Sequence, residues 1–197
     1  MFYHIVILLT FNLVHNTASA TSLNTNLVAY YSFSGDATDS SGNGHHGVVH
    51  SATLSTDRFG TPDSAYSFDG SSSYIEIVNG SAFNFANELT ISVWVKPGNP
   101  PAGFTDVIGK SHNPGGWVLQ KRTGGLDQFH WGHFSAISGF YLPPALPQLD
   151  SVWQHIAVTK QGATVVLYLD GLQVSSGQAP DSSIRSNSNL PVTIGAA

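Results

Sequence analysis

The residues best suited to chemistry lie in a short glycine-rich segment, residues 36–47. Asp36, Asp39 and Asn43 supply carboxylate and amide oxygens there, and Gly42 and Gly44 let the chain turn tightly around them. Calcium takes about six to eight oxygen ligands of these kinds. An ordinary turn uses the same residue types, because Asp and Asn hydrogen-bond to nearby backbone and Gly adopts positive φ. The segment therefore indicates either a calcium loop, with Asp39 and Asn43 as first ligands, or a plain turn.

A second group of candidates is aromatic. Trp117, Trp131 and Tyr141 can stack on sugar rings if they line an exposed groove, because aromatic faces bury apolar C–H surface. The alternative is that the two tryptophans extend the core.

Catalytic groups are sparse. Retaining glycosidases need two carboxyl groups about 5–5.5 Å apart, whereas the chain has only two glutamates, Glu76 and Glu88, on different expected elements. Ser, His and Asp are plentiful enough to leave a triad open, but no G-x-S-x-G elbow supports one. We predict that the protein is not an enzyme.

The histidines raise the question of a transition-metal site. No helix with a His-x-x-x-His or His-Glu-x-x-His motif is expected, so no two of them are brought onto one helix face. His130 and His133 would point to opposite sides of one strand. We interpret the group as solvated turn and strand histidines: His45, His46, His50, His130 and His133.

Composition excludes several classes of function. Hydrophobic residues make up 41% and charged residues 10% of the 197 positions, unlike a disordered chain. The formal net charge of −5 offers no basic surface for phosphates, so nucleic acid is not an expected partner. Cysteine is absent, which removes disulfides and thiol chemistry.

The N-terminus has the pattern of a secretory leader. Residues 5–9 begin a short apolar run, and Ala18-Ser19-Ala20 is an A-x-A cleavage site. The run is shorter than the roughly 20 residues of a membrane span, so we expect no membrane insertion. The sequence predicts a signal peptide over 1–20, a polar lead-in over 21–26 and one domain over 27–197, secreted to the extracellular space. The alternative is a buried first strand or helix.

The elements that must position these residues are short strands. Apolar residues alternate with polar ones over 27–33 and, most clearly, over 89–95. Further strands are expected at 73–78, 117–121, 129–134, 152–160, 164–169, 172–174 and 191–194. Many short strands with Gly, Asp and Asn between them predict an all-β, antiparallel sandwich, jelly roll or barrel.

Four stretches together resemble the laminin-G-like, concanavalin A-like lectin and glucanase jelly-roll family. They are LVAYYSF at 27–33 leading into DSSGNGHHG at 39–47, YSFDGSSSYIEI at 66–77, LTISVWV at 89–95, and WQHIAVT at 153–159 with LYLDG at 167–171. The resemblance implies a two-sheet antiparallel jelly-roll sandwich that binds carbohydrate or an extracellular protein, often with calcium. It also places Trp94 and Trp153 on core strands of the family, so both are assigned to the core. A glycan-active enzyme and a structural adhesion module of a larger protein are the alternatives.

One departure from the family concerns the end of the domain. Family members usually continue past a strand like 193–195 into a closing strand, which commonly supplies a calcium ligand. The chain stops at Ala197. The resemblance therefore implies a module that lacks its C-terminal closing strand, with an exposed sheet edge.

Overall fold

The computed structural model describes residues 2–4, 26–98, 103–110, 115–123, 128–134, 139–142, 150–185 and 190–196. Within these ranges the chain forms antiparallel strands, and the one helical element is a short 3-10 turn, Gly80–Phe83. No helix in the described part is long and apolar enough to cross a membrane.

In the part of the chain that the structure describes, the first sheet has seven strands, in the order β13-β12-β11-β6-β1-β4-β3. Its long strand β6 pairs with β11 over eight consecutive residue pairs, from Gln154↔Val95 to Gln161↔Glu88. The strands are β1 (Phe2–His4), β3 (Thr53–Ser55), β4 (Ala65–Ser67), β6 (Glu88–Lys96), β11 (Gln154–Gln161), β12 (Thr164–Leu169) and β13 (Leu172–Gln178).

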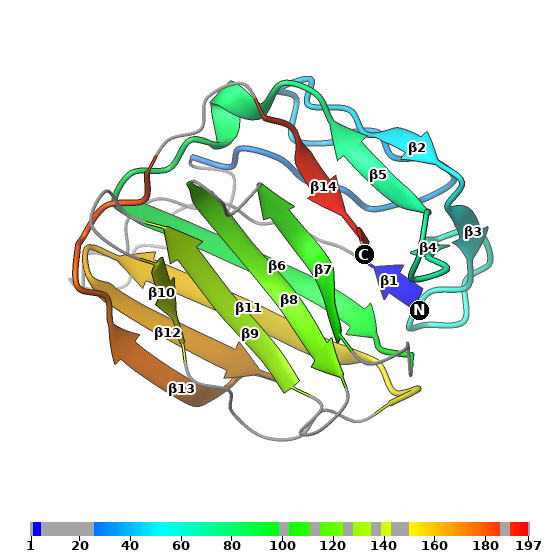
Figure 1. Ribbon diagram of the computed structural model, residues 1–197. Helices are drawn as coiled ribbons and strands as arrows, with labels where there is room; N and C mark the ends of the chain where they lie inside the picture. Colours follow the sequence, from blue (N-terminus) through cyan, green and yellow to red (C-terminus); the bar gives the residue numbers. More distant parts are fainter. Residues whose placement is uncertain are drawn as a thin grey trace, which may run out of the picture.

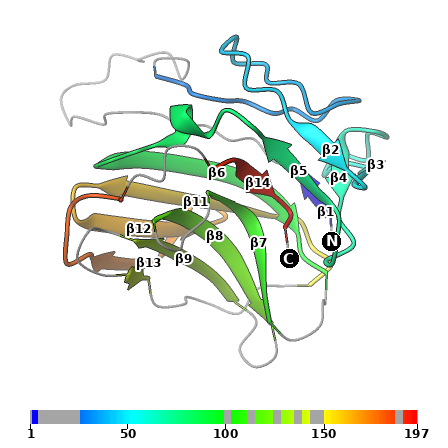
Figure 2. The same cartoon turned by 45° about the horizontal axis from the view of Figure 1, so that its top comes forward.

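The second sheet also has seven strands, in the order β10-β9-β8-β7-β14-β5-β2. It lies in front of β6, β11, β12 and β13 in Figure 1, and Figure 2 shows the two layers from another side. Its strands are β2 (Val48–His50), β5 (Tyr74–Ile77), β7 (Gly103–Lys110), β8 (Gly116–Thr123), β9 (Gln128–Phe134), β10 (Gly139–Tyr141) and β14 (Val192–Ile194). The protein is a two-sheet antiparallel jelly-roll sandwich, as the sequence predicts.

The alternation in β6 explains how the first sheet meets the core. Leu89, Ile91 and Val93 are at most 3% exposed and join the hydrophobic cluster between the sheets. Thr90 and Ser92, between them, are half-buried on the outer face. Successive side chains of a strand point to opposite faces, and each buried aliphatic side chain contributes about 1.5–3 kcal/mol.

Two of the sequence expectations change in detail. Ala29, Tyr31 and Phe33 are fully buried, which confirms the alternation over 27–33. Among the described residues this segment nevertheless forms no strand, only an isolated bridge between Tyr31 and Asp39. Strands β2, β3, β4, β7 and β10 were not expected, because most are three residues long and β7 begins and nearly ends with glycine.

The N-terminal strand lies inside the segment predicted to be a leader. Phe2–His4 pairs antiparallel with β4 on one side and with β6 on the other. The rest of the predicted leader and most of the lead-in, residues 5–25, fall outside the described residues. The signal peptide stays a prediction. At the other end, β14 lies between β5 and β7.

Candidate functional site

Asp39, the first predicted calcium ligand, binds backbone N–H groups. Its Oδ1 accepts hydrogen bonds from the N–H of Tyr30 and of Ser41, both at 2.9 Å, and its Oδ2 accepts one from His45 at 2.9 Å. Burial alone would raise the pKa of Asp39, but these hydrogen bonds outweigh it and hold the pKa below its ordinary value. Both carboxylate oxygens therefore fasten the loop to the segment before it.

The other two predicted ligands have similar positions in the turn. Asp36 Oδ1 accepts a hydrogen bond from the Thr38 N–H at 2.9 Å. The Asn43 side-chain amide donates to the carbonyl of Leu27 at 2.7 Å and of Val28 at 3.0 Å. The described residues contain no group of three or more His, Asp or Glu side chains that could hold a metal ion. The turn explanation accounts for these contacts, and calcium binding stays a prediction.

Trp117 and Trp131, predicted to contact ligand, lie in the core. They are 1% and 0% exposed, and their rings stack with centroids 6.1 Å apart. The Trp117 indole N–H donates to the Phe83 carbonyl at 3.1 Å, and that of Trp131 donates to His133 Nδ1 at 3.2 Å. With both rings packed and both N–H groups bonded, neither indole has a face open to a sugar.

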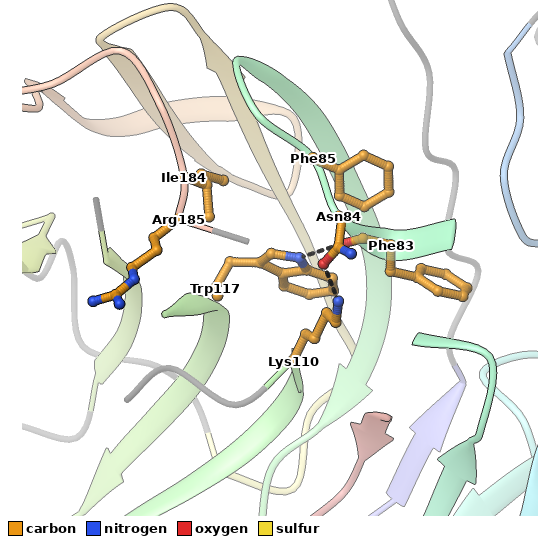
Figure 3. A pocket seen from close by; sticks show the side chains of 8 residues that line it. Phe83, Asn84, Phe85, Lys110, Trp117, Ile184 and Arg185 are labelled. Atoms are coloured by element: carbon orange, nitrogen blue, oxygen red, sulfur yellow. Dashed lines mark hydrogen bonds between the residues drawn. The ribbon is translucent and has the colours of Figure 1, made fainter. Parts of the chain in front are cut away.

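A small hollow adjoins Trp117 where the two sheets meet (Figure 3). It leaves no space wide enough for a single water molecule. Lys110 reaches across it to donate to Asn84 Oδ1, and burial lowers the pKa of this lysine to about 8. Its walls are Phe83, Asn84, Phe85, Lys110, Gly116, Trp117, Ile184 and Arg185. The hollow is a gap in packing and not a ligand pocket.

The opposite face of the same strands carries a different set of side chains. Because neighbours along a strand point to opposite faces, Gln120 of β8 and His130 of β9 face away from the tryptophans. The two residues are cross-strand partners and are 5% and 9% exposed. We call the following set the outer strip: Phe104, Gln120, Arg122, Gln128, His130 and Tyr141.

Tyr141, also predicted to contact ligand, stands at one end of the outer strip. It is 47% exposed and lies over its cross-strand partner Gly132. A Cβ atom at Gly132 would come within 2.7 Å of the tyrosine ring, so only glycine leaves room for the ring in this position. The ring also meets Phe134 edge-on, with centroids 6.0 Å apart. This predicted residue is held in place with half of its surface open to solvent.

Phe104 stands at the other end and is 55% exposed. Its ring lies 6.3 Å from that of His130, and the Arg122 guanidinium carbon is 5.7 Å from its centre. Burial, and then the positive charge of Arg122, lower the pKa of His130. The His130 Nε2 atom has no hydrogen-bond partner. The imidazole is therefore held in its neutral form, with the Nε2 atom enclosed beneath the exposed Phe104 ring.

The structure also revises two interpretations of the sequence. His130 and His133 point to opposite faces as predicted, but both are buried, 9% and 0% exposed, and are not solvated. Trp94, assigned to the core, is half-buried on the outer face of β6. Trp94 has an even number in a strand whose odd-numbered residues, such as Ile91 and Val93, are buried. This alternation already indicated that its side chain lies on the outer face.

The two glutamates do not form a catalytic pair. Glu76 lies on β5 of the second sheet, 3.3 Å from His50 Nε2, and Glu88 begins β6 of the first sheet. Glu76 and Glu88 therefore do not form the pair of neighbouring carboxyl groups that glycoside hydrolysis requires.

Solved structures share the fold at low sequence identity. Domain 4 of an extracellular GH43 arabinanase from Geobacillus stearothermophilus, solved with arabinotriose, superposes with a TM-score of 0.64 at 19% identity, over 86% of this chain and 82% of that one. The binding domain of botulinum neurotoxin serotype D gives 0.59 at 16% identity, over 81% of this chain and 40% of that one. The curated proteins contain no sequence match.

The sequence itself matches a family profile over more than half of its length. The profile covers residues 69–197 and describes the concanavalin A-like lectin/glucanases superfamily. Strands β5 to β14, which include the whole outer strip, fall within the match. The chain belongs to the concanavalin A-like lectin/glucanase superfamily.

Proposed function

We propose that the domain binds carbohydrate on the outer strip of β7–β10. One observation carries the proposal: polar Gln120 and His130 form a low floor between two exposed aromatic rings, Phe104 and Tyr141. Sugar rings present apolar C–H faces and a rim of hydroxyl groups. Aromatic rings bind the apolar C–H faces. Amide and imidazole groups can donate hydrogen bonds to the hydroxyl groups or accept hydrogen bonds from them.

The comparisons support the class of ligand. The arabinanase domain of similar fold holds arabinotriose, and a botulinum neurotoxin type C structure of similar fold concerns interaction with two gangliosides. Both likenesses are of fold, so the place of binding on this chain rests on its own side chains. Secretion to the extracellular space belongs to the same proposal, as does the alternative that the partner is an extracellular protein.

Binding without hydrolysis is the expected behaviour, because the chain's two glutamates stand on different sheets. A reducing-sugar assay on the purified protein with arabinan and other polysaccharides tests this. Release of reducing ends above the level of a heat-inactivated sample would favour the glycan-active enzyme instead.

The test of the site is a binding titration with two variants. We expect arabinotriose, or the best oligosaccharide from a glycan array, to lose about tenfold or more in affinity with Tyr141→Ala or Phe104→Ala, since a stacked ring contributes on the order of 1–2 kcal/mol. Leu172→Ala is the matched control: Leu172 is 72% exposed on β13 of the other sheet. Equal affinity in all three variants would place the site elsewhere.

A further inference from the structure

A second exposed aromatic group lies on the other side of the molecule. The loop between β3 and β4 places Arg58 on the outer face of the first sheet, with its guanidinium carbon 4.7 Å from the centre of the Trp94 ring. The same carbon is 4.1 Å from the centre of the Phe59 ring. We call Phe59, Arg58 and Trp94 the arginine stack. It stands on β6 and the β3–β4 loop, whereas the outer strip stands on β7–β10 of the second sheet.

The loop that carries the arginine stack is fixed by hydrogen bonds. Asp57 is 8% exposed, and its Oδ1 accepts from the N–H of Phe59 and of Thr61, both at 2.8 Å. The Asp57 N–H donates back to the Thr61 carbonyl at 3.0 Å. Phe59 is nevertheless 74% exposed. A large apolar ring held in water by a rigid turn loses little further entropy when a ligand covers it, which favours binding.

The charge of Arg58 is not neutralised locally. In the part of the chain that the structure describes, no carboxylate lies within ion-pair distance of its guanidinium. Its Nη1 atom is buried and has no hydrogen-bond partner, so a ligand would have to meet the guanidinium at its other nitrogens. Unsatisfied donors of charged groups are costly, and the chain as a whole carries a formal charge of −5. The guanidinium therefore lacks the anionic acceptor that such a group ordinarily pairs with.

Trp94 also packs against a residue of the neighbouring strand β11, which is itself hydrogen-bonded. The ring of His155 lies 5.2 Å from that of Trp94, and its Nε2 is 2.7 Å from Ser92 Oγ. The backbone N–H of His155 donates a hydrogen bond to Asp170 Oδ1 at 2.8 Å. The Trp94 ring is thus fixed by the sheet, and the backbone of Phe59 is fixed by the Asp57 turn. This is a preformed surface that combines an apolar ring with a planar cation.

We propose that the arginine stack is a second carbohydrate site, specific for sugars that carry a carboxylate. The ligand's carboxylate pairs with the Arg58 guanidinium, whose planar fork matches it, and the sugar ring covers the exposed face of Phe59. The proposal takes the ligand class, carbohydrate, from the proposed function, but it does not depend on the outer strip. The two sites differ in arrangement: the outer strip places amide and imidazole side chains between two exposed rings and has Arg122 beside one of them, whereas the arginine stack places a guanidinium against both of its rings.

The test uses two probes that differ in one group, methyl β-D-glucuronide and methyl β-D-glucoside. Each is titrated into the full-length, ¹⁵N-labelled protein, with the Trp94 indole N–H and the Phe59 and Gly60 amides as reporters. We expect the glucuronide to shift these signals and the glucoside to bind at least about tenfold more weakly, the usual order of one charge-assisted contact. Added salt should weaken the binding of the glucuronide but not of the glucoside, because salt screens the attraction between the carboxylate and the guanidinium.

Two variants test the assigned roles. Arg58→Gln should remove the preference for the glucuronide, and Phe59→Leu should weaken both probes without disturbing the fold, since Phe59 is 74% exposed. Equal shifts by both probes, no shift by either, or a preference that survives in Arg58→Gln would overturn the proposal.

A third variant separates this site from the outer strip. Tyr141→Ala should leave glucuronide binding at the arginine stack unchanged. Loss of neutral oligosaccharide binding in Tyr141→Ala, with the glucuronide response intact, is the result expected if both proposals hold. If the glucuronide signals at Trp94 also disappear in Tyr141→Ala, the two sites are not independent and the second-site proposal fails. If no neutral sugar binds but the glucuronide does, only the outer strip is wrong.

Discussion

The two faces of β8–β10 are made by alternating residues of the same strands, yet they differ in every property that bears on binding. On the inner face, Trp117 and Trp131 stack at 0–1% exposure. On the outer face, Gln120 and His130 lie beside Tyr141, which is 47% exposed. The largest aromatic side chains serve stability here, and smaller rings with polar neighbours are left for recognition. Aromatic content alone does not locate a binding site.

The histidines show the same contrast. Burial lowers the pKa of both His130 and His133. His133 faces inward and its Nδ1 accepts from the Trp131 indole N–H, whereas His130 faces outward and packs against the exposed Phe104 ring. The Nε2 atoms of both are buried without a partner, so the two imidazoles differ in what they pack against and not in burial.

Truncation of an inner-face ring should have the largest effect. Trp131→Ala removes a fully buried indole, and we expect a loss of about 3–5 kcal/mol in the free energy of unfolding, from lost burial and the cavity left behind. Urea denaturation followed by circular dichroism measures it. On the outer face, Tyr141→Ala should lower the free energy of unfolding by less than about 1 kcal/mol. Similar losses in the two variants would break the distinction between the faces.

Acid should act through the inner-face histidine. Burial, and then the charge of Lys160, lower the pKa of His133 to about 4. Below the ordinary value near 6.5 the unfolded chain binds the proton first, so stability should fall as the pH drops from about 6.5 to about 4, by up to about 3 kcal/mol.

His133→Phe, which cannot be protonated, should flatten this part of the stability profile, measured by urea unfolding at several pH values. Leu172→Ala, a change at an exposed side chain that carries no titratable group, is the control and should keep the wild-type slope. An unchanged slope in His133→Phe would show that this imidazole is not held neutral by burial.

Asp39→Ala tests whether the Asp39 carboxylate binds calcium or only holds the turn together. Asp39→Ala leaves three backbone N–H groups without their acceptor, and we expect a loss of about 1–3 kcal/mol in stability. If Asp39 serves only the turn, this loss is the same in calcium and in EDTA. A rise in the melting temperature of the wild type with calcium, absent in the variant, would instead establish a metal loop.

The smallest change tests whether the position of Tyr141 matters. Gly132→Ala places a Cβ atom 2.7 Å from the tyrosine ring, which must then shift while keeping its chemistry. We expect oligosaccharide affinity to fall about threefold to tenfold, with little change in melting temperature. Isothermal titration calorimetry measures the affinity. Undiminished affinity would mean that the ring is not used in its present position.

Much of the fold could be predicted from the sequence, because strand alternation is a local property. The apolar phase of Leu89, Ile91 and Val93 is set by the chain itself, and the structure confirms it. The same phase already placed Trp94 on the other face, although residue type suggested the core. Where both phases are apolar or aromatic, as in β8 and β9, the sequence does not say which face another sheet will cover.

The candidate sites depended on contacts between distant parts of the chain. Tyr141 could be named from its residue type, but its support by Gly132 and its separation from Trp131 follow from the pairing of β9 with β10. Arg58 meets Trp94 only because the β3–β4 loop lies against β6. Backbone geometry fixes local alternation, so the sequence alone determined the strands and the fold class. Which side chains stay exposed together depends on how the sheets stack, and only the tertiary structure decided that.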